Sequence, residues 1–177
     1  MLKIGKVGFF QLRLKTYSFQ QKINIGKRIK QICKKNNVKF LINDDPKLSK
    51  KLNADGCHLG QQDMSILEAR KIVGNKIIGI TCHNSINLAK AAITRKADYI
   101  AFGAFYSTKT KKIKYKATTK ILDRVKKLTR IPIVAIGGIN INNYKKLLLN
   151  NANLLAISGY VWKNKKYKPF ETIEKIK

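Results

Sequence analysis

Short apolar runs rich in β-branched residues alternate along the chain with longer segments whose apolar residues recur at helical spacing. The short runs predict strands at 8–14, 39–43, 56–59, 77–81, 99–102, 132–136 and 154–157. The longer segments predict helices at 18–35, 46–52, 65–73, 85–96, 118–128, 142–150 and 169–177. Strict alternation of strand and helix is typical of parallel strands joined by right-handed crossovers.

This pattern predicts an α/β fold, a TIM (β/α)8-type barrel that lacks its first strand and most of its first helix. Residues 1–6 read like the end of a helix that leads into the first predicted strand. No linker or change in composition divides the chain, so we expect residues 1–177 to form a single (β/α) barrel domain, short at its N-terminal end. A truncated chain, a start codon assigned too late and a doubly wound open sheet are the alternatives.

The chain has a large positive net charge, but this charge alone does not indicate a nucleic-acid-binding protein. The 177 residues include 38 Lys and Arg against 9 Asp and Glu, for a formal net charge of +29. The cations are spread along the whole chain, which favours a solvated lysine surface that attracts small anions over a nucleic-acid-binding face. Hydrophobic residues make up 44%, too many for a disordered basic tail, and no apolar run reaches the roughly 20 residues that span a bilayer.

The cysteines bear on the compartment. Cys33, Cys57 and Cys82 are odd in number and lack CxxC spacing, which argues against a disulfide framework and a zinc site. We therefore expect a cytoplasmic protein with no membrane segment. The sequence leaves open whether the chain forms a homo-oligomer.

The first predicted strand carries polar side chains where packing does not require them. With a period of two, Gln11, Arg13 and Lys15 share one face. Ligands of parallel α/β folds bind at the C-terminal ends of the strands, and Arg with Lys suits an anion there. A half-exposed edge strand is the alternative.

The few acidic residues gather at strand ends. Asp44 and Asp45 follow the second predicted strand, and Asp63 follows the third. Asp45 precedes Pro46, as a helix N-cap would. For Asp44 and Asp63 we favour Mg²⁺, because hard oxygen ligands beside cations suit a metal that bridges a phosphate. His58 could equally be a core histidine or a ligand-binding one.

The later strand ends are rich in small and hydroxylic residues. Thr81 and His83 follow the fourth strand, and the long loop 104–117 interleaves hydroxyls with lysines, as a lid over a polyanion would. Gly138 and Ser158 follow the sixth and seventh strands, where backbone N–H groups can hold a phosphate. Two anion sites suit an enzyme that joins a diphosphate substrate to a phosphorylated one.

In order and spacing these segments resemble the thiamine phosphate synthase family over nearly the whole chain. The motifs are Gln-Leu-Arg-Leu-Lys at 11–15, Leu-Ile-Asn-Asp at 41–44, Ala-Asp-Gly-Cys-His-Leu-Gly-Gln-Gln-Asp at 54–63, Phe-Gly at 102–103, Thr-Lys-Thr-Lys at 108–111, Ala-Ile-Gly-Gly-Ile at 135–139 and Ile-Ser at 157–158. The resemblance implies a TIM-barrel transferase of thiamine biosynthesis. It would couple hydroxymethylpyrimidine diphosphate to hydroxyethylthiazole phosphate and release pyrophosphate, in a dissociative reaction assisted by Mg²⁺.

The resemblance also implies a role for each matching residue. Gln11 would contact the pyrimidine, and Asp44 and Asp63 would bind Mg²⁺. The diphosphate would be held by Arg13, Lys15, Asn43 and Lys111, with Arg13, Lys15, Thr81 and Lys111 as the catalytic set. Thr108 and Thr110 match lid residues, and Gly138, Ile157 and Ser158 match the second phosphate site. At three positions the chain departs from the residue that is common in the family: Thr81 stands in place of Ser, Asp45 in place of Arg, and Ser107 in place of Pro.

Three rivals stay open. The related thiazole tautomerase (TenI-like) uses a loop histidine, a role that His83 could fill, but that enzyme tends to lose the metal carboxylates and the Gln-Leu-Arg-x-Lys pattern. Another barrel phosphate enzyme, an epimerase or isomerase, needs an acid–base pair that the strand ends do not offer. An inactive truncated barrel that binds anionic ligands or nucleic acid is the third.

Overall fold

The computed structural model describes residues 2, 6–108 and 114–176. They form two compact units, Leu2–Ile80 and Thr81–Lys177, and each unit alternates parallel strands with helices. None of the helices in these stretches has the length and apolar character that crossing a membrane requires. The expectation of a single domain stays a prediction.

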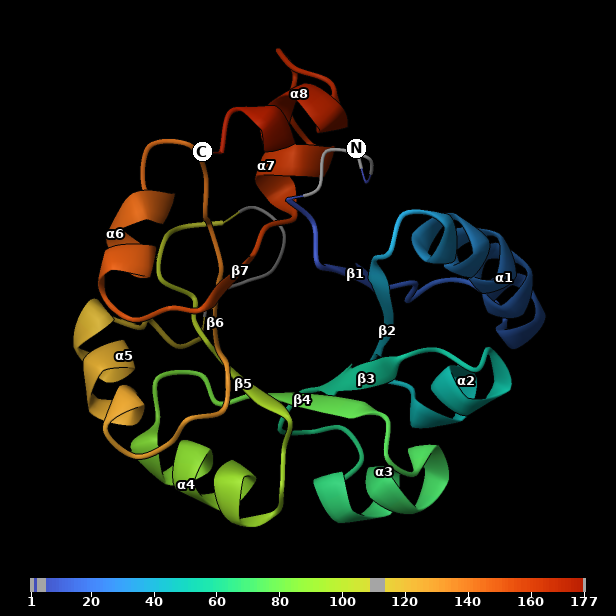
Figure 1. The fold of residues 1–177 in the computed structure, drawn as a ribbon, viewed down its shortest axis with the longest axis horizontal. Helices are drawn as coiled ribbons and strands as arrows, with labels where there is room; N and C mark the ends of the chain where they lie inside the picture. The colour runs from blue at the N-terminus through green and yellow to red at the C-terminus, as the bar shows by residue number, and fades with distance from the viewer. Residues whose placement is uncertain (1, 3–5, 109–113, 177) are drawn as a thin grey trace. The chain divides into compact units, whose positions relative to one another are not determined.

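The first unit places its strands in chain order. Its elements are β1 (Phe9–Leu12), α1 (Phe19–Lys35), β2 (Lys39–Asn43), α2 (Pro46–Lys51), β3 (Gly56–Leu59), α3 (Ile66–Val73) and β4 (Ile77–Thr81), the last residue of which belongs to the second unit. All three strand pairs are parallel, with Gln11 opposite Leu41 and Asn43 opposite His58. Figure 1 shows α1, α2 and α3 on one side of these strands, and Phe40, Ile42 and Ile78 are buried in the unit's core.

Capping residues fix where these helices begin. Ser18 and Gln21 form a capping box at α1, and Ser65 and Glu68 form another at α3. At α2 the Asp45 carboxylate accepts a hydrogen bond of 2.9 Å from the Leu48 N–H, with Pro46 at the first helical position. The prediction that Asp45 is an N-cap is therefore confirmed.

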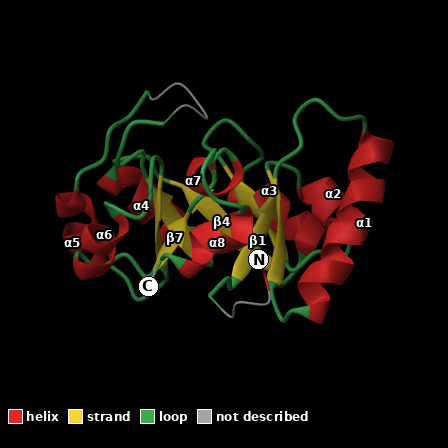
Figure 2. Ribbon diagram, turned by 90° about the horizontal axis from the view of Figure 1, so that it is seen from above, coloured by secondary structure: helices red, strands yellow, loops and turns green. Residues whose placement is uncertain are grey.

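The second unit repeats the alternation. It contains α4 (Ile86–Thr94), β5 (Tyr99–Phe102), α5 (Thr119–Lys126), β6 (Ile133–Ile136), α6 (Tyr144–Leu149), β7 (Leu154–Ala156), α7 (Gly159–Trp162) and α8 (Pro169–Glu174). The strands β5, β6 and β7 are parallel and follow chain order. Figure 2 shows α4, α5 and α6 beside the strands of this unit, over a core that includes Phe102, Leu122 and Ile133.

The bounds of β2, β3, β4 and β5 match the predictions, the other predicted helices and strands are shorter by one to three residues, and two differences affect the interpretation. The strand predicted over 8–14 ends at Leu12, the last residue paired with β2, so Arg13 and Lys15 lie in the following loop rather than on a strand face. The helix α7 was not predicted, because four residues are too few to show a helical period. Of the predicted helix end at 1–6, only Leu2 and Lys6 lie among the described residues.

Candidate functional site

A cavity of about 290 Å³ opens within the first unit, where β1 and β2 end. Its lining residues are Arg13, Leu14, Lys15, Lys22, Asn43, Asp44, Asp45 and Asp63. The structure therefore brings together five residues that the sequence selected from three separate strand ends. Leu14 and Lys22 were not singled out from the sequence, and Asp45 was expected only as a helix cap.

Gln11 and Asn43 are linked at the edge of this cavity. The Gln11 Nε2 donates a hydrogen bond of 2.5 Å to the Asn43 Oδ1. Gln11 pairs with Leu41, so Asn43 lies two residues beyond the position opposite Gln11 and on the same face of the sheet. This contact fixes the orientation of both amides and leaves the Asn43 Nδ2 as a donor toward a ligand.

Hydrogen bonds of the backbone position Asp44 and Asp63, two of the three aspartates that line the cavity. Asp44 adopts a left-handed conformation, with φ of 63°, and its N–H donates a hydrogen bond of 2.8 Å to the His58 carbonyl. The Asp63 Oδ2 accepts a hydrogen bond of 2.7 Å from the Gly60 N–H. A non-glycine residue at positive φ is uncommon and is found at functional sites when its surroundings hold it there.

The charges of the cavity are tightly balanced. Burial of Asp44, its hydrogen bond to Asp63 and the negative charge of that carboxylate raise the pKa of Asp44. Lys15 opposes this shift, with its Nζ 3.5 Å from the Asp44 Oδ2. Two neighbouring carboxylates repel each other unless a cation lies between them, so this pair favours a bound cation.

His58 is a buried neutral group behind the cavity. Its exposed fraction is 7%, and burial lowers the pKa of its imidazole to about 4, against a smaller opposing effect of the Asp63 charge. Both His58 and Cys57 are buried. Every residue of β3 is buried, as is typical of a parallel strand covered on both faces.

The donor set fits Mg²⁺ better than a metal that needs a full protein cage. Asp44 and Asp63 supply hard oxygen ligands, and no group of three or more His, Cys, Asp or Glu in the described parts of the chain could hold a metal. Mg²⁺ keeps several waters and is usually bound through one or two carboxylates together with substrate phosphates.

In the second unit the predicted phosphate site is built from backbone. Gly137 and Gly138 follow β6 with φ of 92° and 67°, a conformation that glycine adopts without strain. A Cβ on Gly138 would lie 2.4 Å from the carbonyl oxygen of Ser107. Within the described residues no hydrogen bond uses the N–H of Gly138 or of Ser158, so both remain available to an anion.

The other predicted site residues of this unit lie at or after the ends of β4, β5 and β7. Thr81 ends β4 half-buried, Thr108 is half-buried in the loop after β5, and Ile157 and Ser158 directly follow β7. Thr110 and Lys111 lie outside the described residues.

His83, the histidine that a tautomerase would use, has a partner in the same unit. Its ring stacks on Tyr115 with centroids 4.3 Å apart. Its carbonyl accepts a hydrogen bond from the Gly103 N–H. The ring is thus held against an aromatic side chain.

Comparison with known proteins places this arrangement in a family. The thiamine monophosphate synthase model matches residues 1–161. The thiamine-phosphate synthase of Pelagibacter ubique (strain HTCC1062) is 67% identical over 177 residues, which cover 100% of this chain and 86% of that protein. The thiamine-phosphate synthase of Marinobacter nauticus is 41% identical over 156 residues, covering 88% of this chain and 70% of that protein.

Solved structures agree on the fold. Thiamine phosphate pyrophosphorylase from Pyrococcus furiosus matches with a TM-score of 0.87 and 27% identity, over 96% of this chain and 80% of that one. A 3-hexulose-6-phosphate synthase matches with a TM-score of 0.70 at 12% identity, over 99% of this chain and 88% of that one, and supports the fold alone. The predicted (β/α) barrel class is confirmed, and the chain belongs to the thiamine monophosphate synthase family.

Proposed function

We propose that this chain is a thiamine phosphate synthase that joins hydroxymethylpyrimidine diphosphate to hydroxyethylthiazole phosphate. The observation that carries the proposal is the cavity of the first unit, which groups Arg13 and Lys15 with the carboxylates Asp44 and Asp63. Cations and a carboxylate pair in one cavity suit a diphosphate bound together with Mg²⁺. When bound, Mg²⁺ would neutralise charge on the leaving pyrophosphate.

The reaction needs no protein nucleophile. The bond between the pyrimidine methylene carbon and the diphosphate oxygen breaks, and its electron pair leaves with pyrophosphate. The electron-rich aminopyrimidine ring stabilises the resulting cation, and the lone pair of the thiazole nitrogen then forms the new carbon–nitrogen bond. The chain's task is electrostatic, because charge develops on the leaving group and water must be kept from the cation.

Each side chain would have a distinct part in this task. Arg13 and Lys15 would hold the diphosphate as a planar fork and a point charge, with Asn43 and Lys111 as further donors. Gln11 would orient the pyrimidine, and Thr81 would donate a hydroxyl to the same substrate. Asp44 and Asp63 would hold Mg²⁺. The second phosphate would bind at Gly138, Ile157 and Ser158, and Thr108 and Thr110 would belong to the lid.

The test is product formation by the chain itself. With both substrates and Mg²⁺ we expect thiamine phosphate, and with EDTA none. Asp63→Ala should abolish Mg²⁺-dependent pyrophosphate binding, measured by calorimetry, because the metal would keep only Asp44, which is already paired with Lys15. Asp123→Asn is the matched control, since Asp123 lies on α5 and accepts a hydrogen bond from the Asn151 side chain.

Two results would contradict the proposal. Metal-dependent activity that survives Asp63→Ala would remove this carboxylate from the site. Steeply salt-dependent polyanion binding that Arg13→Ala leaves unchanged, without thiamine phosphate formation, would instead favour an inactive barrel that binds polyanions through its net charge.

A further inference from the structure

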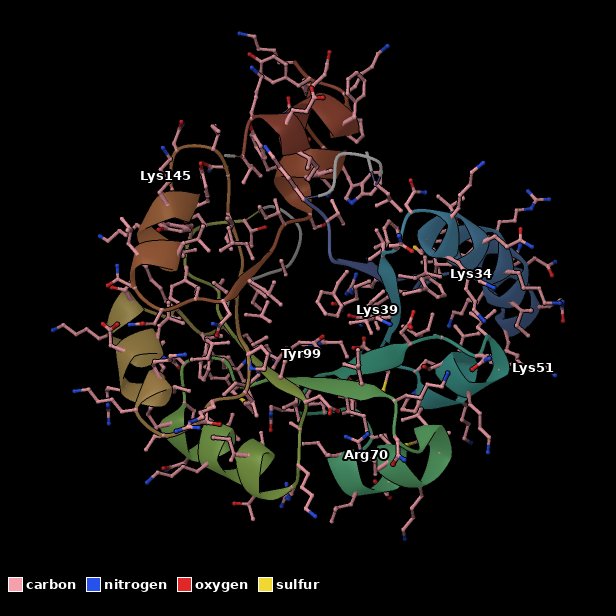
Figure 3. All side chains as sticks on the ribbon, in the orientation of Figure 1. Lys34, Lys39, Lys51, Arg70, Tyr99 and Lys145 are labelled. Carbon is pink, nitrogen blue, oxygen red and sulfur yellow. The ribbon has the colours of Figure 1, made fainter. Side chains whose placement is uncertain are left out.

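The lysines of α1 are not equivalent. Lys27, Arg28, Lys34 and Lys35 are exposed, and Figure 3 shows side chains extending from the outer faces of α1 and α2, where Lys34 and Lys51 are labelled. Lys22 and Lys30 are half-buried, and of these two Lys22 is the one that lines the cavity. It lies four residues before the buried Gly26, so it shares the helix face that packs into the unit.

Lys22 lines the cavity that holds Arg13 and Lys15. Lys22 takes part in neither the ion pair of Lys15 with Asp44 nor that of Lys39 with Asp55. The Asp45 carboxylate, which lines the same cavity, is already used as the N-cap of α2. Lys22 thus adds a third positive charge beside Arg13 and Lys15, which a bound anion would offset.

The helix itself makes this position unfavourable for a cation. The Lys22 N–H donates to the Ser18 carbonyl at 2.9 Å, which places Lys22 in the first turn of α1. The N-terminal end of a helix carries partial positive charge and favours anions, and α1 has no acidic residue in its first turn. We therefore expect Lys22 to contribute nothing favourable to the start of α1, while it adds positive charge to the cavity.

We propose that Lys22 is a third cationic ligand of the diphosphate, binding its phosphate oxygens together with Arg13 and Lys15. This inference rests on the proposed function and adds to it a binding residue that no strand end supplies. A substrate diphosphate would provide a counter-ion for Lys22. Lys22 would then belong to the binding of the pyrimidine substrate and not to that of the thiazole phosphate.

The test compares Lys22→Met with Lys27→Met, which removes an exposed lysine of the same helix. Calorimetry with pyrophosphate and Mg²⁺ should show binding about ten-fold weaker for Lys22→Met, as expected for one lost charge-assisted hydrogen bond. Lys27→Met should bind as the wild type does. Lys22→Arg should recover part of the affinity, and the Tm of Lys22→Met should equal or exceed that of the wild type, because the unfavourable charge at the helix start is gone.

Steady-state kinetics separates this inference from the proposed function. Lys22→Met should raise the KM for the pyrimidine diphosphate and leave the KM for the thiazole phosphate unchanged. Unchanged pyrophosphate affinity in Lys22→Met, or an equal loss in Lys27→Met, would overturn the role of Lys22 and leave the synthase intact. If the wild type forms no thiamine phosphate, and Lys22→Met still binds pyrophosphate more weakly than the wild type, the synthase function is overturned. Lys22 then remains a diphosphate ligand.

Discussion

The two proposed anion sites, one in each unit, differ in construction. The first unit offers charged side chains, Arg13 and Lys15 with Asp44 and Asp63, around one cavity. The second unit offers backbone N–H groups at Gly138 and Ser158, on short turns after β6 and β7. The proposed site in the first unit would therefore bind its anion mainly through charged side chains, and the one in the second unit mainly through backbone N–H groups.

This difference matches the two proposed substrates. A diphosphate that must leave with a full electron pair needs neutralising charge, which side chains and a metal provide. A monophosphate that only anchors its substrate needs geometry, which a glycine turn provides without a net charge. The contrast predicts that charge removal will damage the first site and that added side-chain volume will damage the second.

The largest expected effect comes from Arg13→Ala. Removal of the guanidinium deprives the leaving group of its planar fork, and we expect kcat/KM for the pyrimidine diphosphate to fall by about a hundred- to a thousand-fold. The affinity for the thiazole phosphate should not change. A parallel loss of affinity for both substrates would break the contrast between the two units.

In the first unit, the buried His58 should make the stability of the protein depend on pH. Because burial lowers the pKa of His58 to about 4 from 6.5, the unfolded chain takes up a proton first as the pH falls. The free energy of unfolding should thus decrease as the pH falls from 6.5 to 4, and His58 should account for roughly 3 kcal/mol of that decrease. Urea unfolding in metal-free buffer measures the effect. His58→Asn should flatten the profile over this window, and an unchanged slope would contradict the assignment.

Gly138→Ala tests the backbone site without changing its charge. A methyl group at Gly138 would lie 2.4 Å from the Ser107 oxygen, and alanine is strained at this positive φ. We expect the KM for the thiazole phosphate to rise about ten-fold and stability to fall by about 1–3 kcal/mol. Gly74→Ala is the matched control, since Gly74 has φ of 63° and open space around its Cβ position. Equal effects of both substitutions on that KM would contradict a phosphate site at Gly138.

The smallest effect on stability belongs to Lys15→Met. The Lys15 side chain is 57% exposed and Asp44 is 29% exposed, and ion pairs near solvent contribute little. The free energy of unfolding, measured by thermal denaturation, should therefore change by less than about 1 kcal/mol. The affinity for pyrophosphate should fall by about ten-fold. A large loss of stability with unchanged affinity would make Lys15 a structural residue.

The sequence predicted most of the fold because the buried strands are short, apolar and bounded by clear turns. It misplaced the end of β1, where the alternating pattern continues to Leu14 although pairing with β2 stops at Leu12. The loop nevertheless brings Arg13 and Lys15 to the cavity. Lys22 escaped notice because lysines occur along the whole of α1, and only packing distinguishes a half-buried one from its exposed neighbours. The backbone conformation of Asp44 leaves no mark in a residue pattern.

That conformation restricts which residues position 44 can accept. With φ of 63°, it admits glycine, asparagine and aspartate readily, and straight-chain residues poorly. Glycine and asparagine fit the backbone but lack a carboxylate, whereas glutamate keeps the carboxylate and loses the preferred conformation. Aspartate alone meets both demands. The neighbouring Asp45 caps α2 instead, so these two consecutive aspartates are not interchangeable.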